Sequence, residues 1–509
     1  MTPAAAVPDA VTRRLITASV MAATLMNSLD TTIANVALPH IQGSVAASAE
    51  QITWVLTSYI VAAAIMTPLT GWLASRFGRR RLMQVSIIGF TVASGLCGIA
   101  HTLGEIVGFR LLQGIFGAAL VPMSQAILLD INPPEKHGQA MAIWMMGAIV
   151  GPILGPVIGG WLTDNLTWRW VFFINLPVGV LAFLGVSAFL NEIRTDTPVR
   201  LDFLGFAALG IAIGALQMML DRGQQLDWFS STEIWIEAGV AALCLYIFIV
   251  QTMTARAPFV DPRLFMDRNF LVCTVIGFII GALLFAVLSV LPQLLEGLMG
   301  YPVVTTGLVM APRGVGSFIA AMVIGQLGRR LDGRLMIGLG LLLNAVSLFM
   351  LSHLSLQADE KAIILSGFIQ GLGSGMVFAP LATMAFATLD VNFRNEGAAM
   401  FTLLRNLGSS IGISLLQVLT FRNTQTVQSR LVEGLRPDNP AVLTMPSRFS
   451  LTDPSGIAAL GGEVSRQSAM VSYVDAFWLL GVVSLLSIGL IIFLSPPRKG
   501  GEAPAMHME

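Results

Sequence analysis

The chain has 509 residues, of which 55% are hydrophobic and 11% charged, and its mean hydropathy is +0.77. This composition excludes an ordinary soluble globular protein and is typical of a protein that crosses a membrane many times. The formal net charge is zero, which says nothing about partners, and no nucleic-acid partner is expected.

Fourteen apolar windows are each long enough to cross a hydrocarbon core of ~30 Å. They lie near residues 15–38, 52–74, 82–100, 106–129, 139–161, 170–190, 201–220, 232–252, 269–292, 303–327, 335–353, 362–386, 397–420 and 471–494. The sequence therefore predicts an all-α polytopic membrane protein with 14 transmembrane helices. Cys97, Cys244 and Cys273 all fall inside windows, so neither a disulfide framework nor a metal site is expected.

The placement of Lys and Arg predicts the orientation. With the N-terminus in the cytoplasm, the inner side carries eighteen of these residues and the short outer loops carry three, namely Arg169, Arg222 and Lys361. The long outer loop 421–470 adds five more, but long translocated loops obey this rule poorly. Both termini are therefore predicted to be cytoplasmic.

Asp30 in the first window and Arg110 in the fourth are charges inside the membrane, where each costs ~2.5–3.5 kcal/mol on insertion scales. Their depths allow them to pair if the two helices touch. Asn27 shares the helix face of Asp30, and Gln113 shares that of Arg110, so a polar cluster is expected. A buried carboxylate that faces each side in turn is suited to carry a proton. A static salt bridge that fixes helix packing is the alternative.

The loop after the second window is basic and contains Gly71, Arg76, Gly78 and Arg79, and its glycines permit a tight turn. Positive-inside topology explains this loop without any further role. A latch is the second interpretation, in which the arginines hold helix ends and acids of the other half in one conformation. Asp130 and Glu135 on the next inner loop are the candidate partners.

The fifth window contains two prolines and five glycines within Gly147–Gly160. Hydrocarbon does not tolerate a loop there, so we expect a helix that bends at its prolines and lets a neighbour approach its glycines. The candidate hinge residues are Gly147, Gly151, Pro152, Gly155, Pro156 and Gly159. The alternative is that glycine and proline are simply common in membrane helices.

Two arginines lie deep in the later windows, Arg313 in the tenth and Arg405 in the thirteenth. Arg405 is a candidate cavity residue together with Asn27 and Gln113. It is expected to meet an unwound backbone carbonyl or an acidic substrate, or else to join two helices.

The basic segment Gly71–Arg81 recurs at Gly325–Arg334, and Gln113-Gly114 recurs at Gln370-Gly371, on the same predicted sides. Such repeats indicate a parallel duplication, as in transporters built from two bundles that rock around a central cavity. The expected domains are an N-terminal six-helix bundle over 1–190, two inserted helices with linkers over 191–268, and a C-terminal six-helix bundle over 269–509 with the long outer loop 421–470.

Several of these segments resemble one family, the fourteen-span drug:proton antiporters of the major facilitator superfamily, and its EmrB-like branch in particular. The segments are Leu29–Pro39, Gly71–Arg81, Arg110–Gly114, Gly147–Gly160, Trp168–Pro177, Met219–Phe229 and Leu291–Leu295. One departure is Ser75, where the superfamily usually has an aspartate. This departure weakens the latch interpretation.

The resemblance implies the major facilitator fold, with two inserted central helices, and export of hydrophobic toxic compounds in exchange for protons across a bacterial inner membrane. Asp30 and Arg110 would be the proton-coupling pair, and the fifth-window motif would be the hinge. The proton motive force would supply the energy, with no cofactor. The family also implies a periplasmic membrane-fusion adaptor and an outer-membrane channel as partners. Loop 421–470 would then be a docking surface, and a disordered linker is the alternative.

Four other classes of protein were weighed against this interpretation. No filter segment indicates a channel. The five histidines have no ligand spacing, which disfavours a membrane enzyme. The absence of a phosphate-binding Gly-x-x-x-x-Gly-Lys-Ser/Thr motif excludes nucleotide-driven pumping. A uniporter or symporter of the same superfamily stays as the alternative, disfavoured by the fifth window.

Overall fold

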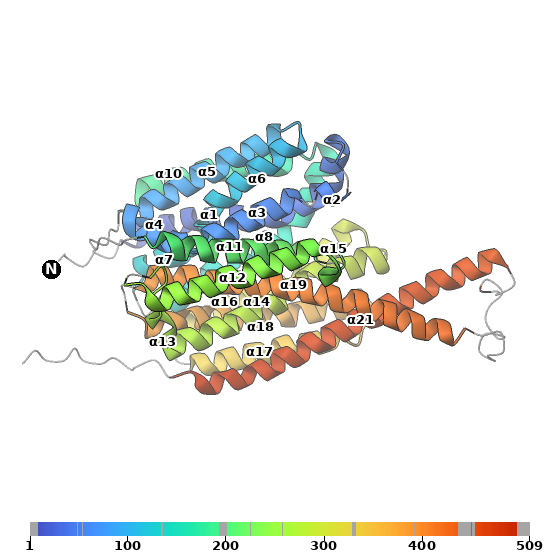
Figure 1. Cartoon of the computed structure of the whole chain (residues 1–509). Helices are drawn as coiled ribbons and strands as arrows, with labels where there is room; N and C mark the ends of the chain where they lie inside the picture. Colours follow the sequence, from blue (N-terminus) through green and yellow to red (C-terminus); the bar gives the residue numbers. More distant parts are fainter. Residues whose placement is uncertain are drawn as a thin grey trace, which may run out of the picture.

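The computed structural model describes residues 9–495, apart from 48, 53, 134–135, 193–200, 224, 257, 328–331, 391–392, 436–448 and 450–452. Its regular secondary structure is entirely helical across these residues (Figure 1). The all-α prediction is therefore confirmed.

The described residues of the first part of the chain form ten helices, some of which join end to end. These are α1 (Ala10–Ser44), α2 (Ala49–Ile52), α3 (Trp54–Met66), α4 (Leu69–Phe77), α5 (Arg79–Ile99), α6 (Leu103–Gly117), α7 (Leu120–Ile131), α8 (His137–Asn165), α9 (Trp170–Phe173) and α10 (Asn175–Phe189). The later part contains α11 (Phe203–Arg222), η2 (Trp228–Ser230), α12 (Thr232–Thr254), α13 (Arg263–Met266), α14 (Arg268–Pro292), η3 (Gln293–Leu298), α15 (Val303–Met310), α16 (Pro312–Leu327), α17 (Gly333–Leu351), α18 (Glu360–Ala387), α19 (Arg394–Glu433), α21 (Pro454–Ser487) and η6 (Ile488–Phe493).

Eleven described segments are long and apolar enough to cross a membrane, and the bent pair α3/α4 makes twelve. The 58° bend of this pair lies at Thr67-Pro68, where proline lacks the amide that a helix interior needs. Neither α1, with 35 residues, nor α8, with 29, is among the twelve, but both exceed the ~20 residues needed to span a bilayer. Including both would give the predicted fourteen spans, so that count stays a prediction.

Helices α11 and α12 lie between two groups of helices, one around α5, α6 and α10 and the other around α17, α18 and α21 (Figure 1). Gly210 and Gly214 of α11 face Ile65 of α3. On its other side, Ser414 of α19 donates a hydrogen bond of 3.1 Å to the carbonyl of Leu220. Helix α11 therefore contacts helices on both sides of it. The domain limits expected from the sequence stay a prediction.

Helices α19 and α21 extend beyond the rest of the bundle (Figure 1). The expectation of a loop over 421–470 is thus wrong at both of its ends, because residues 421–433 continue α19 and residues 454–470 begin α21. Residues 421–433 contain no proline or glycine, and Pro454 occupies a first-turn position where proline is tolerated. The two helices are linked by a 2.7 Å hydrogen bond from Asn423 to Asp475.

Candidate functional site

Asp30 of α1 and Arg110 of α6 form a buried ion pair. Arg110 Nη1 lies 2.6 Å from Asp30 Oδ2, and the exposed fractions of the two side chains are 1% and 0%. The contact predicted between them is therefore present. Removing either partner would leave an uncompensated charge away from water, which is strongly destabilising.

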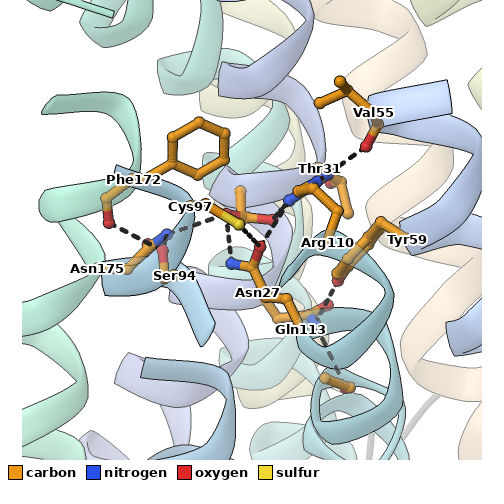
Figure 2. A network of polar contacts seen from close by, with 12 residues as sticks. Asn27, Thr31, Val55, Tyr59, Ser94, Cys97, Arg110, Gln113, Phe172 and Asn175 are labelled. Atoms are coloured by element: carbon orange, nitrogen blue, oxygen red, sulfur yellow. Dashed lines mark hydrogen bonds and ion pairs between the residues drawn. The ribbon is translucent and has the colours of Figure 1, made fainter. Parts of the chain in front are cut away.

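Two neutral side chains, Gln113 and Asn175, also contact the Asp30 carboxylate, and both are labelled in Figure 2. Gln113 Nε2 and Asn175 Nδ2 donate to Asp30 Oδ1 at 2.9 and 3.0 Å. Asn175 is positioned by Ser94, which accepts a second bond of 3.0 Å. Both carboxylate oxygens thus have donors, as a buried charge requires.

Further contacts hold Arg110 in place (Figure 2). Its Nε donates to the Val55 carbonyl at 3.0 Å, and its Nη1 donates to Gln113 Oε1 at 2.9 Å. The guanidinium lies 4.3 Å from the centre of the Tyr59 ring, a cation–π geometry. Gln113 therefore binds both charges of the pair at once. We call the set Asp30, Arg110, Gln113, Asn175 and Tyr59 the charge network.

A cavity of about 220 Å³ adjoins this network. Helices α1, α3 and α7 line one side, α14 and α19 line the other, and Gln217 of α11 contributes from the edge. Tyr59 connects the cavity to the ion pair, because it lines the cavity and its ring contacts Arg110; Asn27 also lines the cavity, and its Nδ2 donates to the Tyr59 hydroxyl at 2.9 Å. A molecule in the cavity would therefore touch the network through these two side chains.

The three predicted cavity residues have different locations. Asn27 and Arg405 line the cavity, from opposite sides. Gln113 does not line it and lies behind the wall in the charge network, which corrects the expectation. Its Nε2 donates to Asp30, its Oε1 accepts from Arg110, and the side chain is fully buried, so a substrate in the cavity does not reach it.

The glycines of α8 pack directly on α1, the helix that carries Asp30. A Cβ on Gly151 would lie 2.6 Å from Ser28 Cβ, and one on Gly159 would lie 2.8 Å from Ile33 Cγ1. Gly147 and Gly155 likewise meet Met21 and Thr32 of α1. The expected close approach is thus present. Helix α8 runs without interruption from His137 to Asn165, and the side chains of Pro152 and Pro156 lie outside the described residues.

The predicted latch residues form contacts within the first group of helices. Gly78 has φ +89°, and the Glu192 carboxylate occupies the space of a Cβ, so the position requires glycine. Arg79 forms an ion pair with Asp130 of α7 and donates to the Ala126 carbonyl at 3.3 Å. Arg76 is exposed, Gly71 is buried, and Glu135 lies outside the described residues. The partner found for Arg79 is therefore in the same half, not the opposite one.

Sequence reasoning missed Asn175, Ser94 and Tyr59 as members of the network. All three are buried polar side chains within apolar spans. The energetic cost of polar groups in hydrocarbon could have singled out Asn175, as it did Asp30.

Three comparisons place the chain among known proteins. The model of the Major Facilitator Superfamily matches residues 20–413. The multidrug export protein EmrB of Escherichia coli (strain K12) is 37% identical over 500 residues, covering 97% of this chain and 98% of the relative. The fatty acid resistance protein FarB of Neisseria gonorrhoeae is 35% identical, with coverages of 96% and 97%. The structure of the proton:xylose symporter XylE aligns with a TM-score of 0.61 at 14% identity, covering 96% of this chain and 97% of that chain.

Proposed function

The chain belongs to the major facilitator superfamily, and we propose that it exports hydrophobic toxic compounds in exchange for protons, by alternating access. The superfamily consists of transporters. The EmrB relative, named as a multidrug export protein, matches nearly the whole chain. The observation that carries the proposal is the position of Asp30, a buried protonatable carboxylate one layer behind a cavity between the two groups of helices.

Proton coupling follows from the two states of this carboxylate. When ionised, Asp30 holds Arg110, Gln113 and Asn175 around it. A proton on Asp30 removes the charge that attracts Arg110 and weakens the charge-assisted hydrogen bonds. Arg110 would then shift beneath the Tyr59 ring, and Tyr59 lines the cavity. Protonation and substrate binding would thus compete through shared neighbours.

The contacts between the two groups of helices suit an alternating cavity. Thr402 of α19 donates a hydrogen bond to Gln125 of α7 at 3.4 Å. Separately, Val157 of α8 packs against Gly307 of α15. Helix α8 is proposed as the moving part, because its glycines present no side chains of their own to α1 and let the two helices approach closely.

The proposal also includes a membrane orientation and partners for the chain. We place this multi-pass protein in the bacterial inner membrane with both termini cytoplasmic. The ends of α19 and α21 that extend from the bundle would then lie in the periplasm. There they could meet a membrane-fusion adaptor, which would link the transporter to an outer-membrane channel.

A uniporter or symporter of another substrate is the competing function. The likeness to XylE supports the fold alone, since the identity is 14%. A symporter would require proton and substrate to move in one direction. The proposed shared neighbours of proton and substrate favour exchange instead.

Inside-out vesicles with an imposed proton gradient, acidic inside, test the proposal. Candidate lipophilic compounds are added while a pH-sensitive dye reports the gradient. Vesicles with the wild-type chain should show collapse of the gradient on addition of a substrate, and vesicles without the chain should not. Accumulation of the compound without any proton movement would exclude antiport, and a compound that deepens the gradient would also contradict it.

A further inference from the structure

The wall of the cavity between α1, α3, α14 and α19 carries one charged side chain among the described residues, and that side chain is a cation. Arg405 projects from α19, and the remaining wall residues are neutral. The neutral residues include apolar ones such as Ile60 and Phe285 and amides such as Gln217 and Asn406. The cavity is therefore positive and mainly apolar.

Arg405 has donors that the protein leaves unused. Its Nη2 donates to the neutral Asn406 side chain at a long 3.4 Å, and its Nε has no partner. The guanidinium lies 5.7 Å from the centre of the Trp144 ring, a cation–π contact that supplies no negative charge. No described carboxylate forms an ion pair with Arg405. A cation inside a membrane needs a partner, and this one has an open cavity in front of it.

Asp30 lies behind the cavity wall, and its carboxylate is not available to pair with a cationic ligand while it is bound to Arg110. Its Oδ2 is taken by Arg110, and its Oδ1 accepts from Gln113 and Asn175. It also does not line the cavity. A cationic compound would meet Arg405 without a counterion, whereas an anion would satisfy it.

We propose that this cavity binds small amphiphilic organic anions, with a carboxylate on Arg405 and the apolar part against residues such as Ile60 and Phe285. The inference rests on the proposed function in taking this cavity as the substrate site, and it adds the charge class of the substrate. The volume of about 220 Å³ is below the ~300–1,000 Å³ of typical ligand pockets, which favours a small ligand.

Equilibrium binding to the purified full-length chain tests the charge class. The probes are 4-phenylbutyrate, 4-phenylbutylammonium and neutral 4-phenylbutanol, which share one skeleton and differ in charge. At pH 8 the first two are ionised. The wild type should bind the carboxylate about tenfold or more tightly than the ammonium, because only the carboxylate completes a charge-assisted hydrogen bond with Arg405.

Variants of Arg405 test whether this residue causes the preference for the carboxylate over the ammonium. Arg405→Gln should lose the preference. Arg405→Lys should retain part of it, because a point charge remains without the guanidinium fork. Arg430→Gln is the matched control, since it removes the same charge from an exposed position on the same helix. It should bind like the wild type. Melting temperatures establish that each variant is folded, and the wild-type comparison stands even if Arg405→Gln fails to fold.

Three results would overturn the proposal. These are equal or tighter binding of the ammonium by the wild type, an unchanged preference in Arg405→Gln, and no binding of any probe. Because the assay needs no proton gradient, it separates the two claims. A carboxylate preference without proton-coupled transport would contradict the proposed function alone, and transport without that preference would contradict this inference alone.

Discussion

The two halves share a helix frame but bury an arginine at different positions of it, since Arg110 lies four residues before Gly114 and Gly367 holds the matching position before Gly371. In the first half, Gly114 of α6 packs on the Tyr59 carbonyl of α3, and in the second, Gly371 of α18 packs on the Arg313 carbonyl of α16. Arg110 has Asp30 beside it. Arg313 is 3% exposed, and its Nε and Nη1 have no partner.

The corresponding glutamines differ in the same way. Gln113 bonds both charges of the pair, whereas Gln370 Oε1 receives no hydrogen bond. Helix α14 corresponds to α1 in its packing, yet it contains no Asp or Glu between Asp267 and Glu296. The duplicated frame is thus shared, but a protonatable group at mid-helix exists in one copy. If the proposed proton coupling holds, we therefore expect the proton to be carried in the first half, while the second half supplies fixed positive charge.

The largest expected difference is between Arg110→Met and Arg313→Met. The first leaves Asp30 buried without its cation and should destabilise the protein by ~3–5 kcal/mol. The second removes a buried charge that has no counterion, so stability should be unchanged or higher. Thermal unfolding of both purified variants measures the contrast.

A double variant sharpens this first prediction. Asp30→Asn combined with Arg110→Met removes both charges and should recover much of the stability lost in Arg110→Met, but no proton-coupled transport. Equal destabilisation by the two single arginine variants would show that Asp30 is not what distinguishes the halves.

Glycine substitutions give the next largest effect. Gly151 of α8 packs on α1, and Gly408 of α19 packs on the Phe278 backbone of α14. Alanine at either site should cost ~1–3 kcal/mol, because the added methyl group meets backbone atoms. Transport should fall further for Gly151→Ala, since α1 carries Asp30. Gly239→Ala is the control, as a Cβ there would meet nothing within 4 Å. Equal losses of transport from Gly151→Ala and Gly408→Ala would contradict the proposal that α8 is the moving part.

The smallest effect is expected from neutral polar side chains. Asn175→Ala removes donors from Asp30 and Ser94 and should cost ~1–3 kcal/mol, because a buried acceptor loses its bond. Gln370→Leu removes a group with an unsatisfied oxygen and should be nearly neutral. The denaturation midpoints of the two variants measure this difference in stability. A larger loss of stability in Gln370→Leu than in Asn175→Ala would contradict the prediction.

The charged part of the site was predictable from the sequence because of its cost. A carboxylate and a guanidinium inside the membrane demand partners, and the long side chain of Arg110 spans much of the expected difference in depth from Asp30. The glycine face of α8 was predictable from its four-residue spacing. Such patterns are local, so they can be recognised before the fold is known.

The rest depended on packing in three dimensions. Which neutral groups reach Asp30 is decided by the approach of α10 and α6 to α1, so Asn175 was missed and Gln113 was assigned to the cavity wall. The continuation of α19 and α21 past the bundle was also missed. Apolar windows mark where a helix lies in hydrocarbon and do not show how far it continues into water.

The central claim is that Asp30 carries the coupled proton, and proton release on substrate binding tests it most directly. Purified protein in a weakly buffered solution with a pH indicator is mixed with a compound that the wild type exports in vesicles. The wild type should release protons on binding, and Asp30→Asn should bind the compound without release. Release of equal size from Asp30→Asn would place the proton on another group and contradict the account.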